Sequence, residues 1–186
     1  KKKATDTAIK SAFLKGNTRE HLLLFYDDKG ISGSVPDNEV IKIKFEIDTQ
    51  PPAEASFEKK YRLLPAPYEV NMYDEPSLFA GKLHAVICRN RRTRVKGRDL
   101  YDYMFYMSNG AHVNLPHLRA RLIDSGFITE NDACELEDVK KMLMNKFDTI
   151  DYKQAREDVI PFIKAPSKMD LWSADFFQQI TENLME

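Results

Sequence analysis

The chain has 186 residues, and its 28 Lys and Arg nearly balance its 29 Asp and Glu, so a net charge of −1 excludes a partner selected by bulk electrostatics. Its hydrophobic fraction of 42% is enough to bury about 70% of the unfolded surface, which excludes disorder as the main state. No stretch approaches the roughly 18 apolar residues of a membrane helix, and the first residues lack the apolar core of a signal peptide. We therefore expect a soluble, cytoplasmic protein with no membrane partner.

Cysteine and histidine give little sign of metal chemistry. Cys88 and Cys134 have no Cys or His neighbour at metal-ligand spacing, so we expect neither a zinc site nor a disulfide scaffold. We interpret the histidines as solvated or capping residues, since no two of them converge with a carboxylate on one ion: His21, His84, His112 and His117.

The charge is unevenly distributed along the chain. Residues 82–98 contain seven Lys and Arg and no acid, whereas residues 130–186 contain seven basic and thirteen acidic side chains. A local positive field concentrates phosphates or nucleic acid, although such a run is also typical of a solvated surface.

The first 73 residues carry strand patterns. Residues 9–14 and 21–25 flank Gly16 and Asn17 and predict the two arms of a hairpin, and residues 27–38 predict a loop.

Residues 40–48 alternate apolar and polar positions, which predicts a strand that displays Glu46 and Asp48 on its polar face. Residues 61–72, interrupted by Pro65 and Pro67, predict an extended segment that bends or lies at a sheet edge. The side chains expected to face a core from the strand at 40–48 are Ile41, Ile43, Phe45 and Ile47.

From residue 74 the hydrophobic period changes from two to about 3.6, which predicts a sheet region over residues 1–73 and a helical domain over residues 74–186. Asp74 is the expected N-cap of the first helix. Lys82 and Arg89 are seven residues apart and share one face of this helix, about 10 Å apart along its axis. The two cations are therefore spaced to reach one polyphosphate or one carboxylate cluster. The expected apolar stripe of this helix is Phe79, Leu83, Val86 and Ile87.

A basic loop over residues 90–97 precedes a helix over residues 98–107 that is apolar on most sides and is therefore expected to be buried. Its two acids, Asp99 and Asp102, are expected to enter a protein interior or a cleft. Trp172 is expected to anchor the last helix in the core. The remaining predicted helices cover residues 115–125, closed by Gly126, and residues 130–147, 152–163 and 173–185.

Two interpretations of the charged residues follow from spacing alone. Cations facing buried acids suit a site for phosphate and Mg²⁺. In the other interpretation, Asp99 complements the helix dipole, and Arg98 and Asp102 form an ordinary i,i+4 ion pair.

A family resemblance adds to this choice. Residues 78–86 with Arg89, followed by residues 95–103, resemble the AbiEii/AbiGii nucleotidyltransferase toxins, whose pattern is a helix with Lys and a downstream Arg, then an Arg-Asp-x-x-Asp helix. Residues 42–48, followed by Pro51 and Pro52, are similar to the family's middle strand and turn. The resemblance implies an α+β fold of the DNA polymerase beta-like superfamily, with a partial nucleotidyltransferase-type mixed β-sheet followed by an α-helical domain.

The resemblance also implies an activity. A toxin of a toxin-antitoxin or phage abortive-infection system would transfer a nucleotide from a nucleoside triphosphate to an RNA or protein acceptor, and a cognate antitoxin would silence it. Mg²⁺ would bridge the nucleotide phosphates and the active-site acids, with in-line attack on the α-phosphate.

The implied site residues divide by role. Lys82 and Asp99 would be catalytic, and the phosphates would be bound by Lys82 together with Arg89 and Arg98. Asp102 would support these site residues. On the strand, Glu46 would be the metal ligand, with Asp48 in reserve.

One family motif is missing. A Gly-Gly or Gly-Ser turn and helix leading to Asp-x-Asp should precede the first strand. Residues 30–34 do not fit it, and Asp37 and Glu39 stand in a loop that contains a proline. Since the first residue is Lys rather than Met, we expect the C-terminal part of a longer enzyme or a protein that has lost transferase activity, and in either case a chain that is inactive alone.

Two alternatives lie outside enzymology. A non-catalytic module would bind RNA through the basic loop from Arg89 to Arg98, so that binding falls steeply with salt. A structural half would only dock to an N-terminal partner chain.

Overall fold

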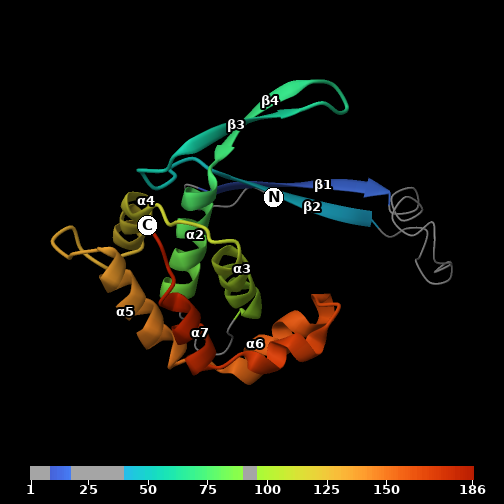
Figure 1. The fold of residues 1–186 in the computed structure, drawn as a ribbon. Coiled ribbons are helices and arrows are strands. Elements are labelled where there is room, and N and C mark those ends of the chain that lie inside the picture. Colours follow the sequence, from blue (N-terminus) through green and yellow to red (C-terminus); the bar gives the residue numbers. More distant parts are fainter. Residues whose placement is uncertain (1–8, 18–39, 90–95) are drawn as a thin grey trace. The chain divides into compact units, whose positions relative to one another are not determined.

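The computed structural model describes residues 9–17, 40–89 and 96–186, with the backbone alone for residues 9–17 and 40–46 (Figure 1). The chain divides into two compact units, Lys1–Pro51 and Pro52–Glu186.

In the first unit, β1 (Ile9–Asn17) pairs antiparallel with β2 (Val40–Asp48), with Ile9 opposite Asp48. β2 has the predicted bounds. Gly16 and Asn17 were expected in a loop and belong instead to β1, because β2 supplies backbone partners along its whole length. The predicted hairpin arm at residues 21–25 and the loop at 27–38 lie outside the described residues.

The prediction that Ile47 faces a core is wrong, because its side chain is 66% exposed. In the described residues this sheet has two strands, and two strands alone bury little apolar surface. The structure does not describe the side chains of the other predicted inward residues of β2, or that of Glu46.

The second unit opens with the antiparallel hairpin of β3 (Phe57–Arg62) and β4 (Tyr68–Tyr73). The single extended segment predicted over residues 61–72 is therefore two strands. Pro65 and Pro67 lie in the connection between the two strands, where the missing backbone N–H of a proline interrupts no hydrogen bond between strands. The α+β class is confirmed, and the described strands form two antiparallel pairs rather than a mixed sheet.

Helices make up the rest of this unit. Figure 1 shows α2 between α3 and α4, and α2 packs on both of them. The helices are α2 (Glu75–Cys88), α3 (Gly97–Ser108), α4 (Leu115–Asp124), α5 (Leu136–Phe147), α6 (Tyr152–Val159) and α7 (Ala174–Thr181), with two 3₁₀ turns, η1 (Ile160–Phe162) and η2 (Pro166–Leu171).

Several helix boundaries differ from the prediction, and α6 ends at Val159 rather than at residue 163, because the chain continues there as the 3₁₀ turn η1. α5 begins at Leu136 rather than at residue 130, because the backbone N–H of Glu135 donates to Asp138 Oδ2 at 3.2 Å, and this capping bond sets the start of the helix. α7 ends at Thr181, after which residues 182–183 form a turn and Met185 forms a backbone bridge with His112.

The core of the helical unit is aromatic. Phe177 on α7 is fully buried and its ring packs against Tyr103, Phe147 and Trp172, with ring centroids 6.2, 5.3 and 5.5 Å away. Trp172 is 1% exposed, as predicted. The predicted stripe of α2 is buried, as expected: Phe79, Leu83, Val86 and Ile87.

The expectation that α3 is buried on nearly every side is wrong. Tyr101 is 37% exposed and Phe105 is 53% exposed. α3 packs on α2 and α6, which cover only part of its circumference. None of the helices in the described residues has the length and apolar character needed to cross a membrane.

Candidate functional site

α2 is held at its start by the predicted cap. Asp74 Oδ1 accepts the backbone N–H of Ser77 at 3.0 Å, and Pro76 stands in the first turn. Although burial raises the pKa of Asp74, hydrogen bonds from Ser56 and Ser77 bring it below its ordinary value. The cap therefore sets where the following residues of α2 lie, including Lys82 and Arg89.

Two ion pairs join α2 to α3. Lys82 Nζ lies 2.6 Å from Asp102 Oδ2, and the guanidinium of Arg89 contacts Asp99 Oδ2. Asp102 thus pairs with Lys82 rather than with Arg98, the i,i+4 partner that spacing alone had suggested. The Asp99 side chain is only 12% exposed, as its predicted entry into a cleft requires, whereas that of Asp102 is 35% exposed.

These side chains line one cavity of about 1000 Å³ between α2, α3 and α4, here named the main pocket. Four cations meet two acids in its wall. The main pocket brings together all the site residues that the sequence analysis assigned to the helices: Lys82, Arg89, Arg98, Asp99 and Asp102.

The other polar residues of this wall were not predicted from the sequence. The interpretation of His117 as a solvated or capping residue is wrong, because it is 1% exposed and its Nδ1 donates to the Ala53 carbonyl oxygen at 2.7 Å. Arg121 Nη1 lies 3.5 Å from His117 Nε2. His84 is half-buried, and burial, followed by the charge of Arg121, lowers its pKa. Positions 117, 121 and 125 are four residues apart, and this spacing could have indicated from the sequence that they share one face of a helix.

Of the two carboxylates that were predicted on β2 as metal ligands, only Asp48 has a described side chain. Asp48 is exposed, and its Oδ1 accepts the backbone N–H of Gln50 at 3.0 Å. Among the described residues there is no cluster of three or more His, Cys, Asp or Glu suited to a metal ion. Because Asp99 and Asp102 already accept from cations, these residues do not fit a Mg²⁺ site built by the protein alone.

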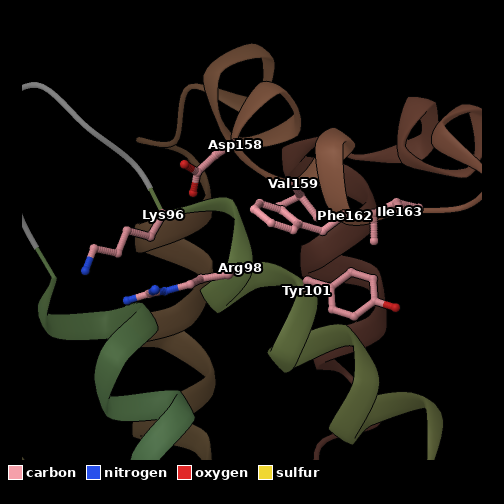
Figure 2. Close-up of a pocket in the computed structure, with 7 residues that line it drawn as sticks. All are labelled: Lys96, Arg98, Tyr101, Asp158, Val159, Phe162 and Ile163. Atoms are coloured by element: carbon pink, nitrogen blue, oxygen red, sulfur yellow. The ribbon is translucent and has the colours of Figure 1, made fainter. Parts of the chain in front are cut away.

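A smaller cavity of about 580 Å³, here named the side pocket, adjoins the main pocket, since Arg98 lines both. Figure 2 shows the charged ends of Lys96 and Arg98 on one side, the ring of Tyr101 on the other and the ring of Phe162 between them. Phe162 is 84% exposed. Residues 90–95 of the basic loop lie outside the described residues, and Lys96 and Arg98 follow them directly.

The comparisons with known proteins identify a family for the chain. The sequence model of the nucleotidyl transferase AbiEii toxin family, of type IV toxin-antitoxin systems, matches residues 2–179. No curated protein and no solved structure matches the chain. With nearly its whole length matched, the chain belongs to the AbiEii family of nucleotidyltransferase-like toxins from type IV toxin-antitoxin systems.

Proposed function

We propose that the main pocket binds the phosphates of a nucleoside triphosphate, for transfer of the nucleotide to an RNA acceptor. Lys82, Arg89 and Arg98 bind the phosphates. Asp99 completes the active site, and Asp102 positions Lys82.

The two cross-helix ion pairs carry this proposal. They hold Lys82 and Arg89 in place before any ligand arrives, so little side-chain entropy is lost when a phosphate binds. The surplus of cations over acids in the wall favours a polyanion. A volume of about 1000 Å³ is sufficient for a nucleotide.

The chemistry asked of these residues is mainly electrostatic. In phosphoryl and nucleotidyl transfer the negative charge shifts between phosphate oxygens, and fixed cations stabilise it without reorganising. Lys82 and Arg89 supply that charge from one rigid helix. Asp99, buried beside Arg89, holds the guanidinium in one orientation.

Mg²⁺ enters the proposal only as the counterion that arrives with the nucleotide. No step depends on it, because the two acids of the main pocket are both engaged by cations. Glu46 as a metal ligand stays a prediction.

We also propose that residues 1–186 on their own bind the nucleotide without transferring it, and that the transfer named above needs the family's Asp-x-Asp motif as well. The reason is that the Asp-x-Asp pair expected of the family's first motif is not found in this sequence. A cognate antitoxin is the expected protein partner of a toxin of this family.

The binding test is titration calorimetry with each of the four Mg²⁺ nucleoside triphosphates. Lys82→Gln should weaken binding about tenfold, equivalent to about 1.4 kcal/mol. The matched control is Lys141→Gln on α5, whose side chain is 73% exposed and outside the main pocket. Equal affinities for the two variants would contradict the proposal.

The side pocket supports RNA as the acceptor. A transferase must hold its second substrate next to the first, and the two pockets share Arg98. Exposed aromatic rings beside cations bind single-stranded nucleic acid by stacking bases and pairing phosphates. Phe162 and Tyr101 supply the rings, and Lys96 and Arg98 flank them.

Fluorescence anisotropy with a short single-stranded oligoribonucleotide tests the acceptor. Phe162→Ala should weaken binding at least fivefold, whereas Phe127→Ala, at a 48% exposed ring outside the side pocket, should not. An abasic oligomer should bind the wild type as weakly as the normal oligomer binds Phe162→Ala. If both oligomers bind alike, the side pocket does not stack bases, and the acceptor is better sought among proteins.

A further inference from the structure

A polar seam runs between α2 and α4, on the side of the main pocket away from the two ion pairs. α2 contributes Ser77, Gly81, His84 and Cys88, and α4 contributes His117, Arg121 and Ser125. Their spacing of three and four residues puts each set on one face of its helix. The α2–α4 seam is therefore a continuous strip of polar wall that the resemblance to the toxin family did not assign.

Arg121 is the charged centre of this seam. Its Nε is buried and has no hydrogen-bond partner within the described residues, and the same is true of His84 Nε2. Among the residues that the structure describes, no carboxylate forms an ion pair with Arg121 either. Asp124 is close enough to influence the His84 ring, yet it does not pair with the guanidinium. Arg121 as a whole is partly exposed, but a buried N–H donor without an acceptor is unfavourable until an acceptor such as a phosphate oxygen reaches it.

The surroundings of Arg121 fix its orientation. Since the Nδ1–H of His117 is committed to the Ala53 carbonyl, the lone pair of Nε2 faces Arg121 and accepts from its Nη1 at 3.5 Å. On the other side stands Gly81, where a side chain would begin 3.8 Å from Arg121 Cζ. The guanidinium thus lies against the bare backbone of α2, one residue before Lys82.

We infer that Arg121 is a phosphate-binding residue, and that the α2–α4 seam receives the end of the polyphosphate that Lys82 and Arg89 do not neutralise. This inference rests on the proposed function, because it assigns a second set of donors to the same nucleotide. The planar fork of a guanidinium suits two oxygens of one phosphate. His84 Nε2 lines the same wall, and in its N–H form it adds a donor. His117 acts as a positioning residue that aims Arg121.

The test uses inorganic triphosphate as the probe, measured by calorimetry and by the shift in thermal melting, on the full chain. Arg121→Gln should lose at least tenfold in affinity for triphosphate. Without triphosphate it should melt at the same temperature as the wild type or higher, because an uncompensated charge has been removed. The matched control is Arg119→Gln, two residues away on the same helix, whose guanidinium donates to the Glu130 carbonyl outside the pocket.

The results separate this inference from the proposed function. If Arg121→Gln and Arg119→Gln bind triphosphate equally, the inference is overturned. If Lys82→Gln loses affinity for the nucleotide and Arg121→Gln does not, the α2–α4 seam has only a structural role, while the proposed function stands. If Arg121→Gln loses triphosphate although the wild type binds no nucleoside triphosphate, the anion site stands and the proposed function fails. Should Arg121→Gln not fold, Arg121→Lys keeps the charge without the fork and should lose about threefold or more; unchanged affinity would overturn the inference.

Discussion

Gly97 offers the sharpest test of how the site is held in place. It is the first residue of α3, it is buried, and its N–H donates to Asp158 Oδ2 at 3.1 Å. A methyl group at this position would overlap the Ala155 carbonyl oxygen and lie 2.6 Å from Val159 Cγ2. Both neighbours belong to α6, so Gly97→Ala must push α3 and α6 apart.

The expected cost is about 3 kcal/mol, at the upper end of overpacking, because the overlapping atom is backbone and cannot rotate away. For a protein of this size that corresponds to a fall in melting temperature of roughly 6 to 12 °C. Since Arg98 and Asp99 follow Gly97 directly, nucleotide affinity should fall as well. Circular dichroism melting and calorimetry measure the two effects.

Gly81→Ala is the matched control for stability. Its new methyl group would find only ordinary contacts, 3.8 Å and beyond, in the middle of α2. Exchange of a helical glycine for alanine should therefore stabilise the chain by up to about 1 kcal/mol. If Gly97→Ala melts within 2 °C of the wild type, the close packing of α3 on α6 described here is wrong.

Three further changes probe the core and the ionisable groups. Phe177→Ala should cost about 4 kcal/mol in urea unfolding, because the ring fills the centre of the aromatic core; a loss under 1 kcal/mol would contradict that position. The Tyr103 hydroxyl bonds Thr181 Oγ1 at 2.6 Å, and Thr181 in turn donates to a backbone carbonyl, so Tyr103→Phe should cost about 1 to 2 kcal/mol. Burial raises the pKa of Tyr103, so its stabilisation is present below about pH 10 and is lost above it, and Tyr103→Phe should flatten the fall in stability from pH 10 to 11. Burial lowers the pKa of His84, so its contribution is present above about pH 6.5 and lost as the pH falls; His84→Asn should lose less stability than the wild type between pH 7 and 5, and parallel curves would refute the assignment.

The positions of many helices could be predicted from the sequence, because helix caps and apolar stripes depend on residues that are close together in the chain. The Asp74 side chain accepts the backbone N–H of the third residue of α2, and the apolar stripe of α2 follows from the helical period. The same period places Lys82 and Arg89 on one face. The alternation of residues 40–48 gave the bounds of β2, while the burial of Ile47 failed because alternation does not reveal how many strands pack together.

The site needed the tertiary structure. Asp102 has Arg98 as its nearest cation at helical spacing, yet it pairs with Lys82, twenty residues away on α2. Arg121 and His117 enter the main pocket only because α4 packs along α2. A side chain's own sequence neighbours determine its helix and its face, whereas its counterion is whichever charge the packing of helices brings within reach. For that reason the sequence alone could predict that cations and acids are present, and only the fold decided which of them share a pocket.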